Sequence, residues 1–520
     1  MYKEDDGQIS IYEFISPFGK LNEENRWVKM ANMIPWQKYE EKYKKQFCTD
    51  NGAPAIKFRM AMGTLLIKQQ TGRSDDEVLE EILESPYKQF LIGLHEFTTE
   101  PPFAQSSITN FRKYIPSEMI DEINNELFRC NPKILGDDDR VSKDEKGEGG
   151  DESQRDETPE GPDNTDSGSK TEDTPAEPKS SAKPENKGTL MLDATCAPAD
   201  IEFPTDINLL NEAREKLEAI IDTIYPVSDY ILKPRTYRKT ARKEYLRYVM
   251  KKKPGYDELR KAIEGQLKYV ARDLKHIDKM HERVSMAGAH ALSDVLSAHQ
   301  QMWLETIRML YKQQLYMYEN NTHTIQNRIV SISQPHVRPI KRDKANAKYE
   351  FGAKVSVSLV SGYAFIDRLG WESYNEESEL IPAVEAYKEY NGYYPERVLA
   401  DQIYRNKNNR AYCKERGIRL SGPRLGRPSA ETDKVTIKQQ AKDSADRSAI
   451  EGKFGEGKNN YGLDRIMARL KDSSETVISM SFLCMNINRR LRVLLRFIFF
   501  GYFQIQMRNN IATALAWISG

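Results

Sequence analysis

Three acidic residues that are far apart in the sequence have contexts that could place them around metal ions. Asp193 follows the apolar run of residues 190–192, and Asp401 follows the apolar run of residues 398–400. Short aliphatic runs of this kind predict buried strands. A buried strand that stops on a carboxylate leaves that carboxylate at a sheet edge, open to solvent. Glu451 lies farther along, on a predicted helix in a basic surround.

Carboxylates gathered in this way suit hard divalent cations. Mg2+ and Mn2+ take oxygen ligands in octahedral geometry. Two such ions roughly 3.5–4 Å apart can clamp the attacking and leaving oxygens of an in-line phosphoryl transfer. The alternative is structural, because aspartates at strand ends also cap turns and helices. Asp200 and Asp206 compete with Asp193, and Asp206 is itself a predicted helix cap.

The charge of the chain is unevenly distributed. The 520 residues carry no net charge and are too many for one small domain, so two or more domains are expected. Residues 137–187 contain 17 acidic and 8 basic residues, whereas residues 401–500 contain 21 basic and 11 acidic residues. A basic block of this size indicates a polyanionic partner, although a solvated surface is the alternative.

Several features favour a cytoplasmic protein. The five cysteines are scattered without metal-ligand spacing, which is typical of reduced thiols. The acidic N-terminus has no apolar segment of the kind found in signal peptides. The most apolar stretch, residues 476–504, is interrupted by four arginines, and a bilayer span needs about 20 largely uncharged residues. We therefore expect no membrane-spanning helix.

Composition and periodicity predict how the chain is divided. Residues 136–188 are rich in Asp, Glu, Ser, Pro, Gly and Thr, which predicts an acidic disordered linker. Strands are predicted at 189–193, 354–359, 364–369, 397–401 and 418–420, with a further extended segment at 199–203. The strands alternate with helices, which predicts an α/β fold with a mixed sheet. The expected domains are a helical N-terminal domain (1–135), the linker, an α/β domain (189–500) with a helical insertion at about 212–330, and a C-terminal tail (501–520).

The N-terminal domain is predicted to be all-α. Ser74 and Glu77 form a capping-box pattern, and Gly72 is placed to end the preceding helix. A helix starting near Ser106 would present Ser, Thr and Asn together with Arg112 and Lys113. That composition suits phosphate and base contacts by a DNA-recognition helix. An ordinary polar helix face is the alternative.

Taken together, the motifs resemble those of the DDE-type transposases of bacterial insertion sequences. The signature of that family around its glutamate is Tyr-x2-Arg-x3-Glu-x6-Lys, and Arg447, Glu451 and Lys458 match it, while Ser444 occupies the Tyr position. The N-terminal region 20–130 is similar to the helical domain that precedes the catalytic domain in the family. The remaining similar segments are residues 192–195, 204–214, 351–355, 399–404 and 422–428.

The resemblance implies a fold and a set of site residues. The expected catalytic domain is RNase H-like, with Asp193, Asp401 and Glu451 as catalytic residues and as ligands of Mg2+ or Mn2+, with two ions expected. For Arg447 and Lys458 we expect phosphate contacts near the scissile bond, with plain surface charge as the alternative. Two further DNA contacts are candidates: Tyr404 could stack on an unpaired base, and Lys354 could reach the backbone. A packed aromatic and a solvent-facing lysine are the respective alternatives.

The resemblance also implies an activity and partners. A metal-activated water would hydrolyse the phosphodiester at a transposon end, and the released 3′-hydroxyl would then attack a target strand. The expected partners are DNA, as terminal inverted repeats and target DNA, and a second copy of the chain in a homodimer on DNA. The expected location is the cytoplasm, in association with the nucleoid. The alternative function is a catalytically inactive, transposase-derived protein that binds DNA sequence-specifically.

Overall fold

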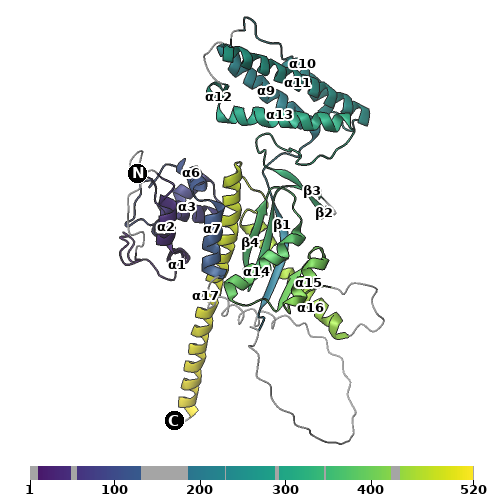
Figure 1. The fold of residues 1–520 in the computed structure, drawn as a ribbon. Coiled ribbons are helices and arrows are strands. Elements are labelled where there is room, and N and C mark those ends of the chain that lie inside the picture. Colours follow the sequence, from purple (N-terminus) through teal and green to yellow (C-terminus); the bar gives the residue numbers. More distant parts are fainter. Residues whose placement is uncertain are drawn as a thin grey trace, which may run out of the picture.

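The computed structural model describes residues 10–47, 55–129, 185–228, 230–286, 292–344, 347–422 and 434–518. A group of N-terminal helices, a mixed sheet with flanking helices, a helical insertion and one long C-terminal helix follow one another along the chain (Figure 1). Most of the segment predicted as an acidic linker lies outside the described residues.

The N-terminal part is all-α, as predicted. The predicted capping box is present, because Glu77 N donates to Ser74 Oγ at 3.3 Å and Ser74 N donates to Glu77 Oε2 at 2.9 Å. Gly72 ends the preceding helix in the left-handed conformation, with φ at 67°. The helices are α1 (Arg26–Met33), α2 (Trp36–Lys44), α3 (Phe58–Thr71), α4 (Asp75–Glu84), α5 (Pro86–Leu91), α6 (Ser107–Tyr114) and α7 (Ser117–Asn124).

Within the described ranges the sheet has six strands and is mixed, as predicted. The strands are β1 (Thr189–Pro198), β2 (Arg338–Lys344), β3 (Ala347–Val360), β4 (Tyr363–Gly370), β5 (Arg397–Ala400) and β6 (Arg419–Leu420). Their order is β2-β3-β1-β5-β6, and β4 pairs with the other half of β3. Strand β1 is antiparallel to β3 and parallel to β5, so it is the central strand. Helices α14 (Leu380–Asn391), α15 (Lys407–Glu415) and α16 (Lys434–Asn460) complete this part.

Two strand predictions are wrong in extent. Strand β1 does not stop at Asp193 but continues to Pro198, because the long strand β3 remains paired with it as far as Gly352. The segment predicted as extended at 199–203 forms only an isolated bridge at Ala199. Strand β2 was not predicted, because this edge strand reads Arg-Pro-Ile-Lys-Arg-Asp-Lys and has no alternation of apolar residues.

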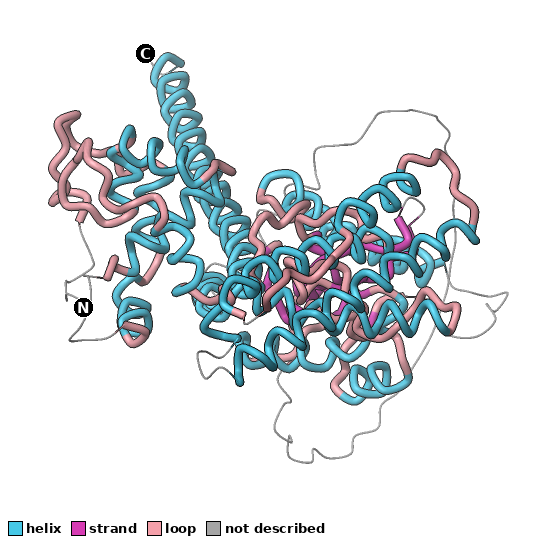
Figure 2. Tube along the Cα trace, turned by 90° about the horizontal axis from the view of Figure 1, so that it is seen from above, coloured by secondary structure: helices cyan, strands magenta, loops and turns pink. Residues whose placement is uncertain are grey.

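The helices predicted between the first two strands are present and have their own core. They are α9 (Asp206–Ile224), α10 (Arg238–Val249), α11 (Tyr256–Met286), α12 (Leu292–Val295) and α13 (Ala298–Glu319). Buried Leu217, Ile221 and Val270 belong to this core, which is distinct from the core of the sheet. Figure 1 shows these helices as a bundle beyond one end of the sheet, and Figure 2, which views the molecule from above, shows helices overlying the strands. Asp206 joins the start of the insertion to its end, because its Oδ1 accepts hydrogen bonds from Gln314 of α13 and from Arg328, which follows that helix.

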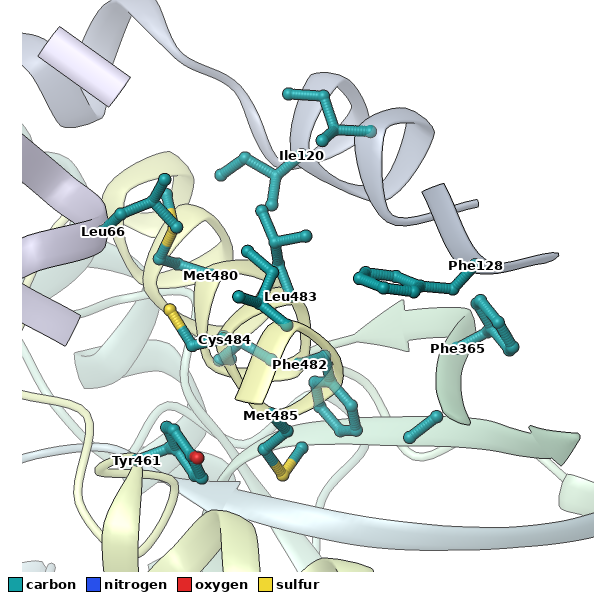
Figure 3. Packing of buried hydrophobic residues seen from close by; sticks show 14 of the residues in the cluster. Leu66, Ile120, Phe128, Phe365, Tyr461, Met480, Phe482, Leu483, Cys484 and Met485 are labelled. Carbon is teal, nitrogen blue, oxygen red and sulfur yellow. The ribbon is translucent and has the colours of Figure 1, made fainter. Parts of the chain in front are cut away.

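Helix α17 (Lys471–Ile518) joins the N-terminal helices to the sheet. It packs against α3 and α7 on one side and against β4 on the other, and Figure 3 shows Leu483 and Phe482 among buried side chains from both. Asn486 fixes the contact, since its amide donates to Asn124 Oδ1 at 2.8 Å and to Ala364 O at 2.7 Å. No helix within the described ranges combines the length and the apolarity that crossing a bilayer requires.

Gly352 provides a test of the β1–β3 contact. A Cβ at this position would lie 2.1 Å from the carbonyl oxygen of Ala197. Because moving the backbone aside costs free energy, Gly352→Ala should lower the free energy of unfolding by about 3 kcal/mol in urea titrations followed by circular dichroism.

The matched control is Gly455→Ala in helix α16, where a Cβ meets nothing within 4 Å. That variant should gain about 0.5 kcal/mol, because alanine favours the helix. If the two variants were equally stable, the close approach of Gly352 to the Ala197 carbonyl oxygen would be contradicted.

Candidate active site

Two of the three predicted carboxylates lie where the pairing of two neighbouring strands ends. Leu192 and Ala400 are register partners in the parallel pair of β1 and β5, and Asp193 and Asp401 are the residues that follow them. Asp193 remains in β1 opposite Val357 of β3, so it marks the point where β1 loses β5 as a partner. Asp401 leaves the sheet and accepts a hydrogen bond from Gln402 N at 2.7 Å. The prediction that a strand ends on the aspartate is therefore correct for Asp401 and wrong for Asp193.

Helix α16 carries Glu451 to the same place, as the sequence predicted for a helical glutamate. Its first half is fixed by ion pairs to the outer strands, with Arg397 at 3.3 Å from Asp443 and 3.0 Å from Asp446. Arg419 of β6 also pairs with Asp443, with 2.9 Å between Nη2 and Oδ1. These contacts attach the helix beside β5, and the next turn of α16 therefore reaches the end of that strand.

Arg447 is the point on which the three carboxylates converge. Its Nη1 lies 3.9 Å from Asp193 Oδ2 and 4.0 Å from Asp401 Oδ1, and its Nη2 lies 3.4 Å from Glu451 Oε1. The side chain of Asp193 is 19% exposed, whereas those of Asp401 and Glu451 are each 58% exposed. The site is thus open on the side of Asp401 and Glu451 and closed behind Asp193.

The environment of Asp193 favours its protonated form. Burial raises the pKa of this carboxyl to about 6, and the nearby charges of Glu376 and Asp401 act in the same direction. The hydrogen bond from Ala194 N at 2.8 Å and the charge of Arg447 oppose the shift. Glu376 lies in the short turn Glu376–Glu379 and was not found from the sequence, because nothing in its local pattern distinguishes it.

The donor chemistry of the site suits a divalent cation, but the side chains are not in a metal-binding arrangement. Three carboxylates at an open sheet edge are oxygen ligands of the kind that Mg2+ and Mn2+ prefer. As they stand, the described residues include no group of three or more His, Cys, Asp or Glu side chains that could hold a metal ion. The guanidinium of Arg447 lies among the carboxylates instead, as their shared counter-ion.

The other candidate site residues lie in different environments. Lys458 is two turns beyond Glu451 on α16, on the same face of the helix, and is partly buried. Lys354 is 12% exposed and bound to Glu376 at 2.9 Å and to Tyr374 O at 2.8 Å. Tyr404 is 1% exposed within the core, which agrees with the packed aromatic and leaves no ring face for a base.

Helix α6 holds the two N-terminal candidates. Arg112 is bound to Asp75 at 2.5 Å and is mostly buried, so it supports the fold of the N-terminal helices in this arrangement. Lys113 is exposed, as are Thr109 and Asn110. The polar face predicted for this helix is therefore present without Arg112.

The raised pKa of Asp193 predicts a pH-dependent stability. Between the ordinary carboxyl pKa near 4 and about 6, the folded protein holds a proton that the unfolded chain releases. The free energy of unfolding contributed by this group therefore falls as the pH rises through that window. In EDTA, Asp193→Asn should be more stable than the wild type by roughly 2 kcal/mol at pH 7.5 and equal to it near pH 4.

Thermal and urea unfolding at pH 4, 5.5 and 7.5 measure this difference. The exposed Asp464→Asn is the control for losing one carboxylate. A constant difference between Asp193→Asn and the wild type at all three pH values would show that burial does not control the titration of Asp193.

Comparisons with known proteins find similarity to transposase domains in two parts of the chain. Residues 17–114 match the transposase domain DUF772, and residues 398–488, which include Asp401 and Glu451, match the transposase DDE domain. The chain is 33% identical over 103 residues to the uncharacterized protein ORF8 in the nfe locus of Rhizobium meliloti. That alignment covers 20% of this chain and 49% of the relative, so the chain spans about half the length of the relative it matches. No solved structure matches the chain significantly.

The two family matches lie on either side of the central strand that carries Asp193. A DDE domain implies an RNase H-like fold, and the mixed sheet with its flanking helices has that character. The chain therefore carries a region similar to a transposase domain near one end and a region similar to a transposase DDE domain near the other.

Proposed function

We propose that this chain binds the terminal repeats of its own DNA element and catalyses metal-dependent phosphodiester hydrolysis and strand transfer. The observation that carries the proposal is the convergence of Asp193, Asp401 and Glu451 on one cationic group at an open sheet edge. A structural role for each acid alone would not require three of them, from two strands and a helix, to face the same guanidinium.

The charge of the site favours the binding of cations. Three carboxylates and one guanidinium leave an excess of negative charge, and the partly buried position of Asp193 makes that charge costly. Asp193, Asp401 and Glu451 would hold Mg2+ or Mn2+, with two ions expected. Bound ions of this kind supply an activated water and stabilise the charge that develops on the phosphoryl oxygens.

The basic residues of α16 have a positional role in the proposal. Arg447, Glu451 and Lys458 lie along one face of the helix, with Lys458 about 10 Å beyond Glu451 at 1.5 Å per residue. If the carboxylates held a cation, Arg447 would be released from them, and its planar group could fork onto phosphate oxygens. Lys458 would bind the next part of the same backbone as a point charge.

The partners in the proposal are terminal inverted repeats, target DNA and a second copy of the chain. Coordinated joining requires two DNA ends to be held together, which a homodimer on DNA provides. The alternative function is that of a catalytically inactive DNA-binding protein derived from a transposase. The presence of all three carboxylates, together with the perturbed pKa of Asp193, favours the enzyme.

Cleavage of a defined duplex tests the enzyme. The purified chain, in Mg2+ or Mn2+, should nick a labelled duplex that carries one end of its encoding element and leave a 3′-hydroxyl. Asp401→Asn and Glu451→Gln should each lower the cleavage rate roughly 100-fold or more while DNA binding is retained. The control is Glu389→Gln, on the exposed side of α14, which should cleave normally. A wild type that binds the ends and never nicks them would establish the inactive DNA-binding protein instead.

Metal binding by the Arg447→Gln variant tests the shared counter-ion. Removing the guanidinium leaves the three carboxylates to repel one another, so the variant should unfold at a lower temperature than the wild type in EDTA. In the variant, Mn2+ would bind without having to displace a guanidinium from the carboxylates. A given concentration of Mn2+ should therefore stabilise the variant more than it stabilises the wild type. The exposed Arg469→Gln is the control. If Arg447→Gln abolished stabilisation by Mn2+, Arg447 would be needed to position the carboxylates, and it would not be a competitor of Mn2+ for them.

A further inference from the structure

Helix α10 of the insertion presents a strongly basic surface that the active site does not use. Residues 233–253 contain ten Lys or Arg residues and one acidic residue, Glu244. We call the exposed cations Lys239, Arg242, Lys243 and Arg247 the α10 basic surface.

The α10 basic surface has no counter-ions within the described part of the chain. Neighbouring cations do have them, since Lys233 and Arg238 pair with Asp222 and Lys251 pairs with Glu258. None of the four cations that define the surface lies within 4.0 Å of a described carboxylate. The single acid on the helix, Glu244, accepts a hydrogen bond from Tyr269 of α11.

This arrangement is unfavourable for the helix itself. Lys239, Lys243 and Arg247 follow one another at intervals of four residues, where like charges repel across each turn. Cations also crowd the first turn, where the helix dipole disfavours them, and Tyr237 gives no side-chain cap. Tyr237 has a φ of 56°, in the left-handed region that a bulky residue rarely adopts. Costs of this kind are typical of surfaces that are retained for a function.

The helix is nevertheless fixed in place, with its charged side outward. Ala241 is its one fully buried residue, and Gln266 of α11 donates to Ala241 O at 3.2 Å. Tyr245 donates to Asn208 Oδ1 of α9 at 3.1 Å. Helix α13 packs on the opposite side of α9 and α11, so α10 is left as an outer helix of the bundle (Figure 1). The basic surface is thus preformed and accessible.

We infer that the α10 basic surface binds the phosphate backbone of duplex DNA, outside the active site and without regard to base sequence. Lys239, Lys243 and Arg247 span about 12 Å along the helix, and one DNA strand places a phosphate roughly every 3.4 Å of duplex axis. The row can therefore contact about three phosphates of one strand. The inference rests on the proposed function only in taking DNA as the partner.

The neutral triple variant Lys239→Gln, Lys243→Gln, Arg247→Gln tests this surface in the full-length chain. Binding to a labelled random-sequence duplex is measured by fluorescence anisotropy in EDTA, across a range of salt concentrations. The affinity should fall roughly 100-fold at 0.1 M salt, and the slope of log K against log salt should become shallower by about 2.7. Because like-charge repulsion is removed, the melting temperature should stay the same or rise.

Two matched variants identify the cause. Lys275→Gln, Lys279→Gln, Lys312→Gln removes three exposed lysines from α11 and α13 and should bind DNA as the wild type does. Lys239→Arg, Lys243→Arg, Arg247→Lys keeps the charge and should retain wild-type affinity. Equal losses in the neutral α10 triple and the α11–α13 triple would overturn the inference, because overall charge would then account for the effect.

A protein partner would give a different result. Leu246 and Met250 are 41% and 80% exposed near the basic side chains, as a docking surface for a second copy would require. If the neutral triple changed the oligomeric state in light scattering and left DNA affinity unchanged, the inference would fail. The binding assay uses no metal, so a chain that never nicks DNA would still allow the α10 basic surface to be tested.

Discussion

The candidate active site depends on the double pairing of the central strand β1. Its parallel ladder with β5 ends at Leu192 and Ala400, and its antiparallel ladder with β3 continues for six more residues. Asp193 lies where one ladder stops and the other continues. It is paired with β3 on one side and is not paired with β5 on the other. The same strand leads directly into the helical insertion, so β1 positions both the acidic site and the outer basic helix. Gly352 permits this long pairing because a side chain there would collide with the backbone of β1.

The acidic site and the α10 basic surface, the two surfaces proposed to be functional, differ in the sign of their charge. At the sheet edge, three carboxylates share the guanidinium of Arg447, which limits their repulsion while keeping them close. On α10 the imbalance is opposite in sign, and nothing in the described part of the chain offsets it for the four cations of the basic surface. An acidic centre for cations and a basic surface for phosphates would be complementary requirements of the proposed action on DNA. Each is a local cost to folding that the two hydrophobic cores must offset.

Helix α17 connects the N-terminal helices to the sheet, although these segments are far apart in the sequence. Asn486 joins Asn124 of α7 to Ala364 of β4, and Arg129 reaches from the end of the N-terminal helices to Ser358 of β3 at 3.2 Å. The N-terminal helices therefore share one apolar core with the sheet (Figure 3). The exposed Lys113, Thr109 and Asn110 of α6 are held in a fixed relation to the acidic site as a result. DNA bound by one surface would meet the other at a defined spacing.

Sequence alone determined the features that have a local signal. Aliphatic runs predicted β1 and β5, the Ser74 pattern predicted a capping box, and helical spacing placed Arg447 and Glu451 on one face. The tertiary structure decided what depends on distant partners. It extended β1 beyond Asp193 through pairing with β3, added the polar edge strand β2, and buried Tyr404. It also brought Glu376 beside Asp193 and placed Arg447 among three carboxylates from separate elements. Local patterns specify backbone preference and the buried face, whereas register and packing across the sheet decide which charges meet.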